Sequence, residues 1–365
     1  MSNKVAILVG TRPNFIKITQ FKKEAEKVNL DLVLIHTGQH YDFKMAGSFF
    51  EQLDIEPDYF LDIEPGNPAL QMGQIIIALS NLLLDLKPEY LVVPGDVNST
   101  LAGAIVANKL NIPLAHLESG LRSSDERMPE EINRILTDKI TNLFFVTEQS
   151  GMDNLRAEKV TDNKLHFVGN TMIDTLVAFD DQIKKSNILQ ELGLIQDDFI
   201  LVTIHRPSNV DDTDSLKFVI SLLKKIAESS KVVFPIHPRT VQHLKQENLY
   251  SQLEENPNIV QTEPLDYFAF QNLILNSKLV LTDSGGIQEE TTFRKVPCLT
   301  LRENTERPIT ISMGSNRLVP FDIDQILEHI ANVDQFDCDI PPLWDGKSTQ
   351  RIVTILKEEI TKKYK

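Results

Sequence analysis

Cysteine is nearly absent from the sequence: its 365 residues include only Cys298 and Cys338. Two cysteines cannot form a disulfide framework and their separation does not match a zinc site, so both are expected to be reduced thiols. No other set of His, Cys and Asp residues has the spacing of zinc ligands. The sequence therefore predicts no bound metal.

Long hydrophobic runs and excess positive charge are also missing. No uninterrupted apolar run approaches the ~20 residues of a membrane-spanning helix, and the start, MSNKVAILVG, lacks the features of a signal peptide. We therefore expect a cytoplasmic protein without a membrane partner. The formal net charge is −15 and no basic stripe offsets it, which argues against a nucleic-acid partner.

What the sequence does contain is two series of short apolar runs separated by amphipathic segments. The runs are continuous, as in strands buried on both faces of a parallel sheet. This pattern predicts an α/β fold with two Rossmann-like domains, residues 1–175 and 176–345, and a final helix, 346–365, that packs back toward the first domain. The predicted strands are 5–10, 32–38, 90–96, 113–120 and 143–147, then 199–205, 232–237, 258–263, 279–285 and 297–302.

Polar and glycine-rich segments follow the predicted strand ends in both halves, where open parallel sheets bind ligands. We therefore expect one ligand cleft, which both domains line. The first segment, GTRPNFIK at 10–17, opens a helix and carries Arg12 and Lys17, which suits a phosphate. A tight turn with two exposed bases explains it equally well. It is neither a GxGxxG nor a Walker A motif, which weakens NAD-binding and ATPase interpretations.

The segment DSGGIQEE at 283–290 is more specific. Ser284, Gly285 and Gly286 would let backbone N–H groups approach a diphosphate closely, and Glu290 on the following helix suits a ribose diol. The alternative is a glycine-rich turn capped by Asp283, with Glu290 on a solvent-exposed face.

Three acidic residues also follow strands or begin a helix: Asp96, Glu118 and Glu130. Each alone is commonly a cap or a surface charge, and Glu130 and Glu131 both favour a helix N-terminus. Together with Arg122 and Arg134 they could transfer protons at a sugar ring beside a bound diphosphate.

His205, next to Arg206, is placed to donate to a phosphate oxygen or to protonate a leaving group, although a lone histidine is more often a cap or a packed side chain. His116 and His237 are expected to be structural.

Eight motifs occur in the order and approximate spacing of one family: GTRPNFIK, HTGQHYD, PGDVNSTLAG, HLESGLRS, MPEEINR, GNTMID, DSGGIQEE and TERP. Over nearly its whole length the sequence resembles the non-hydrolysing UDP-N-acetylglucosamine 2-epimerases. The resemblance implies the two-domain glycosyltransferase-B architecture, a homodimer, a UDP-sugar substrate, no cofactor, and a role in making precursors of surface polysaccharides.

The resemblance also implies a reaction, in which UDP is eliminated to give 2-acetamidoglucal and is then added back with C2 inverted. It implies that Asp96, Glu118 and Glu130 are the catalytic carboxylates and that His205 assists departure of the diphosphate. The residues that it implies contact the nucleotide sugar are Arg12, Lys17, Arg134, Phe270, Ser284, Gly285, Gly286, Glu290 and Arg307, with Phe270 near the uracil and Glu290 on the ribose.

The sequence departs from the family at two places. After Gln39 and His40 it continues YDFKMA, where many members carry a motif linked to a second, activating UDP-sugar, and His205 is followed by Arg-Pro-Ser. Four alternatives remain: an epimerase of a modified UDP-2-acetamido sugar, a hydrolysing epimerase that releases N-acetylmannosamine, a UDP-dependent glycosyltransferase and a non-enzymatic UDP-sugar sensor.

Overall fold

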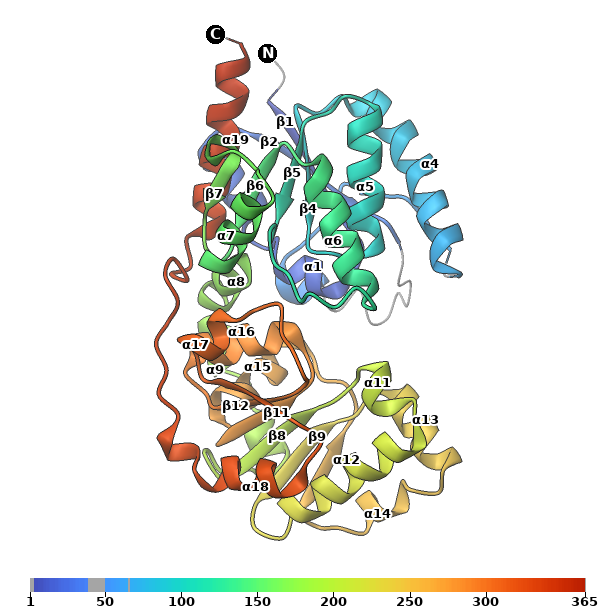
Figure 1. Cartoon of the computed structure of the whole chain (residues 1–365), viewed down its shortest axis with the longest axis vertical. Coiled ribbons are helices and arrows are strands. Elements are labelled where there is room, and N and C mark those ends of the chain that lie inside the picture. The colour runs from blue at the N-terminus through green and yellow to red at the C-terminus, as the bar shows by residue number, and fades with distance from the viewer. Residues whose placement is uncertain (1–2, 39–49, 65, 365) are drawn as a thin grey trace. The chain divides into compact units, whose positions relative to one another are not determined.

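The computed structural model describes residues 3–38, 50–64 and 66–364 of the chain. It divides the chain into two compact units, which Figure 1 shows in sequence colours. Unit 1 comprises Met1–Ala178 and Pro342–Lys365, and unit 2 comprises Phe179–Pro341. The chain therefore leaves unit 1 once and returns to it at the end.

Unit 1 is built on a seven-stranded sheet with the order β3-β2-β1-β4-β5-β6-β7, and every pairing in it is parallel. The central strands are buried on both faces, which explains their continuous apolar sequences. The strands are β1 (Lys4–Val9), β2 (Asp31–His36), β3 (Tyr59–Phe60), β4 (Tyr90–Pro94), β5 (Leu114–Leu117), β6 (Leu143–Val146) and β7 (Leu165–Phe167).

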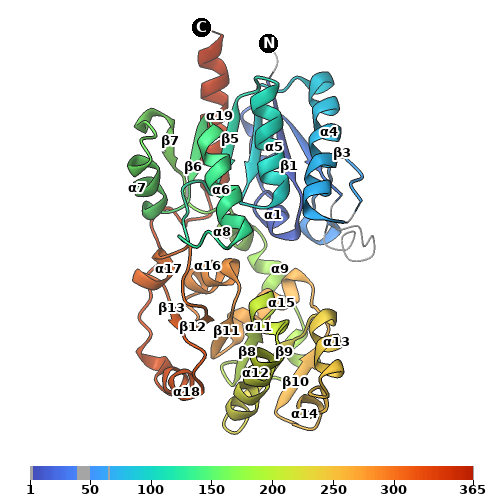
Figure 2. The ribbon, with the colours of Figure 1, turned by 45° about the vertical axis from the view of Figure 1, so that its right-hand side comes forward.

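Helices cover both faces of this sheet, and α4 and α5 lie side by side at one of them (Figure 2). The helices are α1 (Arg12–Ile16), α2 (Phe21–Lys27), α4 (Pro68–Leu86), α5 (Asn98–Lys109), α6 (Pro129–Ile140), α7 (Gln149–Ala157), α8 (Thr171–Ala178) and α19 (Ser348–Lys363), with a 3-10 turn, η1 (Asp162–Lys164).

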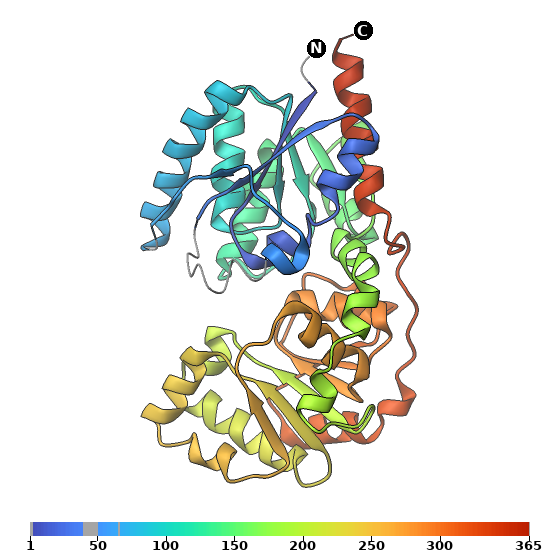
Figure 3. The same cartoon turned by 180° about the vertical axis from the view of Figure 1, so that it is seen from behind.

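The last helix, α19, packs against α2 and α8, and Figure 3 shows it beside α2 from behind. Its start is fixed by the buried Asp174 on α8, whose carboxylate accepts the N–H groups of Ser348 at 3.1 Å and Thr349 at 2.5 Å. Burial raises the pKa of Asp174, and these hydrogen bonds oppose that shift. The N-terminal and C-terminal parts of the sequence therefore pack together in unit 1.

Helix α4 is the one described helix that is long and apolar enough, by length and composition alone, to cross a membrane. Its packing is that of a helix connecting two strands, because it buries Ile75, Leu79 and Leu83 and packs against α5. Only 17% of its most apolar window is buried, so much of its surface is exposed and apolar.

Unit 2 repeats this plan with six parallel strands in the order β10-β9-β8-β11-β12-β13. The strands are β8 (Phe199–Thr203), β9 (Lys231–Pro235), β10 (Ile259–Thr262), β11 (Leu279–Thr282), β12 (Cys298–Leu301) and β13 (Asn316–Val319). The helices are α9 (Asp180–Lys184), α10 (Ile188–Glu191), α11 (Pro207–Val210), α12 (Thr213–Ile226), α13 (Pro238–Gln246), α14 (Ser251–Glu254), α15 (Tyr267–Asn276), α16 (Gly285–Arg294), α17 (Ile309–Ser312) and α18 (Ile323–Ala331), with η2 (Val333–Gln335).

The strand order of each sheet reverses at one point, between β1 and β4 in unit 1 and between β8 and β11 in unit 2. Loops at such a point diverge to opposite faces and leave a crevice at the carboxyl edge, which is the usual ligand site of an open α/β sheet. The segments 10–17 and 95–96 follow β1 and β4, and 205–206 and 283–286 follow β8 and β11. The candidate residues thus flank both reversal points.

The predicted fold class, two α/β units with parallel sheets, is confirmed. The structure adds β3, β7 and β13, which the sequence patterns did not predict. Residues 178–198, which lie between the two series of predicted strands, contain α9 and α10, both of which pack against α15. The segment YDFKMA lies outside the described residues.

Candidate active site

The two basic residues of the loop after β1 differ in their exposure to solvent. Arg12 is exposed at the start of α1, whereas Lys17 is buried and forms an ion pair with Glu118, which follows β5. The carboxylate of Glu118 is itself 4% exposed. A buried ion pair is retained only where its geometry is well satisfied, and loss of one partner leaves a costly uncompensated charge.

Glu118 has a positive φ of 64°, which is unfavourable for a residue with a side chain. Backbone strain of this kind costs of the order of 1–3 kcal/mol, persists only where the surroundings impose it, and is concentrated at functional sites. Positive φ also occurs at Lys87 and Lys295, at the ends of helices, so Glu118 is distinguished by its buried ion pair as well as by its backbone.

Asp96, directly after β4, is bound at both its side chain and its backbone. Its carboxylate pairs with Arg134 of α6, and its carbonyl oxygen accepts the Nδ2–H of Asn133 at 3.0 Å. The same arginine donates to Glu131 at 2.6 Å, and Glu131 also accepts the N–H groups of Ser123 and Ser124 at 3.0 Å. One face of α6 thus connects the loops after β4 and β5.

Glu130 is exposed in the first turn of α6, whereas the neighbouring Glu131 is buried. The structure therefore brings Asp96 together with Arg134, and Glu118 together with Lys17, but it places Glu130 at the surface rather than in either ion pair.

In unit 2, the loop after β8 is held by Asp283, which follows β11 and is completely buried. Its carboxylate accepts from Nδ1 of His205 at 3.1 Å, from the backbone N–H of Arg206 at 2.8 Å and from Nδ2 of Asn209 at 2.9 Å. Burial alone would raise the pKa of Asp283, but the His205 and backbone hydrogen bonds hold it below its usual value. His205 is otherwise exposed, so its Nε2 is available to a ligand.

The glycine-rich turn leads into α16, with Ser284 at the N-cap in an extended conformation. A Cβ on Gly285 would lie 2.7 Å from Oε1 of Glu306 and 3.1 Å from Nη1 of Arg307, so a larger residue would displace the Glu306 carboxylate. Arg307 is buried and pairs with Glu289 at 2.8 Å and Glu306 at 2.6 Å. This network places Arg307 beside the first turn of α16, where backbone N–H groups favour an anion.

Two further predicted residues lie in the interior of unit 2. Glu290 is 4% exposed, and burial raises its pKa to about 7, against the opposing effects of Gln271 and Arg294. Phe270 on α15 is half-buried and packs against a hydrophobic cluster that includes Leu273 and Ile287. The alternative in which Glu290 occupies a solvent-exposed face is therefore wrong.

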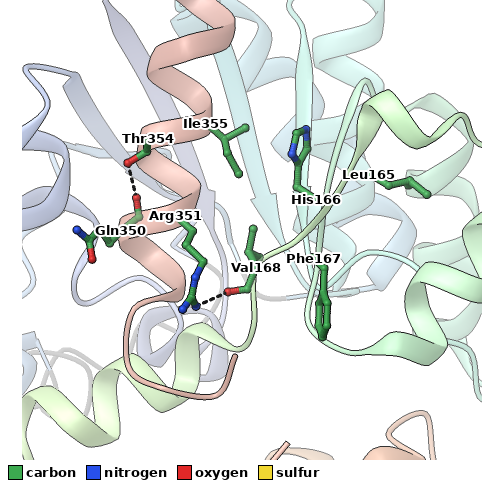
Figure 4. A pocket seen from close by; sticks show the side chains of 8 residues that line it. All are labelled: Leu165, His166, Phe167, Val168, Gln350, Arg351, Thr354 and Ile355. Carbon is green, nitrogen blue, oxygen red and sulfur yellow. Dashed lines mark hydrogen bonds between the residues drawn. The ribbon is translucent and has the colours of Figure 1, made fainter. Parts of the chain in front are cut away.

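A separate cavity of about 540 Å³ lies at the outer edge of unit 1 (Figure 4). Strand β7 and helix α19 line it, and Arg351 at its rim donates to the carbonyl oxygen of Val168 at 3.0 Å. None of the candidate residues is among its lining residues. Within the described part of the chain, no group of three or more His, Cys, Asp or Glu side chains is arranged to hold a metal ion.

Sequence reasoning missed three residues that organise the site: Glu131, Asp138 and Glu289. All three are buried carboxylates that bind a candidate residue or its neighbours. Glu131, Arg134 and Asp138 recur at intervals of three and four on α6, so they occupy one helix face. Polar residues with that period, on a face expected to be buried, were the signal available in the sequence.

Comparison with known proteins places the chain in one family. The family model described as UDP-N-acetylglucosamine 2-epimerase matches residues 22–357. UDP-N-acetylglucosamine 2-epimerase of Methanocaldococcus jannaschii is 42% identical over 360 residues, covering 97% of this chain and 98% of that protein. Its crystal structure in complex with UDP-GlcNAc and UDP has a TM-score of 0.90 at 41% identity, over 97% of this chain and 99% of that one.

Two other known proteins are similar to this chain in different degrees. UDP-2,3-diacetamido-2,3-dideoxy-D-glucuronate 2-epimerase of Pseudomonas aeruginosa is 39% identical over 331 residues, covering 89% of this chain and 90% of that protein. MurG of Acinetobacter baumannii shares the fold alone, with a TM-score of 0.55 at 11% identity over 98% of this chain and all of that one. The resemblance carried by the eight motifs is thus confirmed, and the chain belongs to the UDP-N-acetylglucosamine 2-epimerase family.

Proposed function

We propose that this protein reversibly inverts C2 of UDP-N-acetylglucosamine to give UDP-N-acetylmannosamine for surface polysaccharide synthesis. The observation that carries the proposal is the pair of carboxylates after β4 and β5, Asp96 and Glu118, each held by a cation from another element. Family membership and the sugar nucleotide named for the M. jannaschii complex support the substrate.

The chemistry follows from the substrate. No carbonyl group lies next to C2 to acidify its hydrogen, so cleavage of the bond between C1 and the diphosphate oxygen must accompany or precede proton removal. The C–H electron pair then forms the C1–C2 double bond of 2-acetamidoglucal. UDP departs with the electron pair of the broken bond between C1 and the diphosphate oxygen. Cations and N–H groups already in place stabilise that leaving group without reorganisation. The start of α16, Arg307 and the exposed Nε2 of His205 suit this role.

Inversion sets a second requirement, because the hydrogen leaves C2 from one face of the ring and returns on the opposite face. A single fixed carboxylate cannot serve both faces, so at least two proton-transfer groups are needed. Asp96 and Glu118 come from neighbouring strands with separate cationic partners, which suits them to this task. We assign proton transfer to the pair, with Glu130 as a third, exposed carboxylate.

Incubation with UDP-GlcNAc in D2O tests the proposed function. We expect UDP-ManNAc to appear with one deuterium at C2, since the abstracted proton exchanges with solvent before the glycal is reprotonated. NMR of the sugar and mass spectrometry measure the label. Unlabelled UDP-GlcNAc after prolonged incubation would contradict the proposal for this sugar.

A modified sugar is the second candidate, because the P. aeruginosa relative is named for a 2,3-diacetamido uronate and is nearly as similar as the others. The same assay with UDP-2,3-diacetamido-2,3-dideoxy-glucuronate distinguishes the two, since the preferred substrate has the higher kcat/KM. Free N-acetylmannosamine with UDP would instead indicate a hydrolysing epimerase. Sugar transfer to an acceptor would indicate a glycosyltransferase, and binding without turnover a sensor.

We also propose that two copies of the chain associate through α4. Leu70, Ile77 and Leu84 are exposed at seven-residue intervals and so lie along one face of the helix. Asp85 is the only charged residue from Pro68 to Leu86, in a chain with a net charge of −15. A nearly uncharged face is where two such acidic chains meet without repulsion, whereas an acidic protein is repelled by anionic lipid.

The spacing also fits a two-fold axis. Leu70 and Leu84 are equidistant along the chain from Ile77, so two antiparallel copies of α4 would place Ile77 against itself and Leu70 against Leu84. A two-fold interface requires such self-complementarity.

Replacing Ile77 with aspartate is expected to weaken this association by about 100-fold or more, because two unpaired charges would be buried at the axis. Sedimentation equilibrium measures the effect, and Ile195→Asp, at an equally exposed isoleucine of unit 2, is the matched control. A wild-type protein that is monomeric at micromolar concentration would contradict the proposal. A monomer that also binds lipid vesicles would assign α4 to a membrane instead.

A further inference from the structure

His116 lies at the centre of unit 1, in β5, and is completely buried. Both of its ring nitrogens have close partners. Nδ1 lies 2.7 Å from Oδ1 of Asp138 on α6, and Nε2 lies 2.7 Å from the carbonyl oxygen of Gly95. The sequence predicts a structural histidine here, but one of its partners, Gly95, directly precedes the predicted catalytic Asp96.

These contacts determine where the protons are. A carbonyl oxygen only accepts hydrogen bonds, so Nε2 must carry a hydrogen. In a neutral ring, Nδ1 would then direct a lone pair at Asp138. That carboxylate already accepts from Nη1 of Arg122 at 2.8 Å and from the N–H of Gly120 at 3.1 Å, as an ionised group does. Two facing acceptors would repel, so Nδ1 must carry a hydrogen as well.

The state of Asp138 agrees with this arrangement. Its side chain is almost completely buried, which alone would raise the pKa of the carboxyl group. His116, and then Arg122, outweigh that effect and hold the pKa below its usual value. Asp138 is therefore an anion, and Arg122, which pairs with it, also donates to Glu158 at 2.9 Å.

The Gly95 carbonyl group joins this cluster to the predicted site. Gly95 has a φ of 68°, and an added Cβ would lie 3.2 Å from Nζ of Lys17 and 3.6 Å from Oε2 of Glu118. The peptide held by His116 therefore passes beside the Lys17–Glu118 ion pair and continues into Asp96. Glu118 itself follows His116 by two residues, so one imidazole ring connects the backbone positions of both carboxylates.

We propose that His116 is a positioning residue that carries hydrogens on both ring nitrogens and, with Asp138 and Arg122, fixes the loop from Gly95 to Asp96 beside Glu118. The proposal rests on the proposed function, because it assigns His116 to the geometry of that reaction. The charged His116 ring holds the Gly95 carbonyl group from the interior of unit 1 and does not contact substrate.

The protonation is tested on the wild-type protein by NMR with 15N-labelled histidine, using resonances assigned through the backbone of β5. At pH 7.5 we expect both nitrogens of His116 to be protonated. His166 on β7 is the comparison, since burial lowers its pKa and predicts a neutral ring. In Asp138→Asn the anion is lost, and His116 is expected to give up one proton. A neutral His116 in the wild-type protein would overturn the protonation.

Kinetics test the positioning role. We expect His116→Gln to lower kcat for UDP-GlcNAc by about 10- to 100-fold, because small displacements of a catalytic group cost that much. KM and the affinity for UDP should stay within about twofold. Asp138→Asn should lower kcat similarly, and the double variant should be no worse than either single one, as expected for groups that act as a unit. His166→Gln should retain wild-type kcat.

The outcomes separate the two proposals. If the wild-type protein exchanges C2 hydrogen but folded His116→Gln keeps full kcat, or loses kcat and UDP affinity together, the positioning role is wrong and the proposed function stands. If the wild-type protein does not turn over any UDP-2-acetamido sugar, the proposed function fails, while the NMR measurement still decides the state of His116. Circular dichroism and thermal unfolding establish that each variant is folded, and the wild-type NMR result does not depend on any variant.

Discussion

Replacing Asp96 with asparagine is expected to lower kcat by about 10²- to 10⁴-fold, the usual contribution of a general acid or base. Asparagine has nearly the same shape and its Oδ1 can still accept from Arg134, but it cannot exchange a proton at neutral pH. UDP should therefore bind with nearly wild-type affinity. Steady-state kinetics with UDP-GlcNAc and titration calorimetry with UDP measure the two effects.

Asp96 is a cleaner test than Glu118. Glu118→Gln should also lower turnover strongly, but it leaves Lys17 buried without its counter-ion and is expected to destabilise unit 1 as well. Asp153→Asn, at an exposed carboxylate on α7, is the matched control and should change neither quantity. Wild-type turnover in both Asp96→Asn and Glu118→Gln would remove these residues from the catalytic step.

Replacing Glu290 with glutamine is expected to stabilise the protein at pH 8 and to weaken its binding of UDP. Burial raises the pKa of Glu290 from 4.5 to about 7, so the folded state binds the proton more tightly than the unfolded state. Stability is therefore lost as the pH rises from about 4.5 to 7, and the full loss, of the order of 3 kcal/mol, applies above pH 7. Glutamine never ionises, so the variant does not incur this loss.

Thermal unfolding of both proteins from pH 4.5 to 8 measures this difference, which should be small at pH 4.5 and grow to several degrees at pH 8. Calorimetry over the same range should show that UDP binds wild-type protein more tightly as Glu290 ionises and accepts from the ribose hydroxyl groups. The variant should lack that pH dependence, and Glu255→Gln, at an exposed site, should behave as wild type. A stability difference independent of pH would contradict the raised pKa, and unchanged UDP affinity would place Glu290 outside the nucleotide site.

Much of the fold could be predicted from the sequence because buried parallel strands need continuous apolar residues. Runs such as 5–10 and 199–205 correspond to β1 and β8. Strands β3 and β7 were missed because they have only two and three residues at the sheet edges, where little apolar sequence is needed. Strand order was not predictable, since periodicity identifies a buried strand but not its neighbours.

Several candidate residues could be named from the sequence, but the contacts between them could not be predicted. Glycines and acids after strand ends indicated Asp96, Glu118 and Gly285. The pairing of Lys17 with Glu118 could not be predicted, since these residues are 101 positions apart in the sequence. The buried supporting carboxylates resemble ordinary surface acids until the helix face that carries them is known. Burial, rather than residue type, distinguishes Glu131 from Glu130.

The return of the chain to unit 1 has a consequence for biosynthesis. Domains generally fold as they emerge from the ribosome, starting with the N-terminal one. Here the surfaces of α2 and α8, and the carboxylate of Asp174, receive their partner only when α19, the last helix, is made. Unit 2 is continuous in sequence and can fold first. The unit that is translated first is therefore completed last, and a nascent chain stalled before residue 342 would expose its unfinished surface to chaperones and proteases.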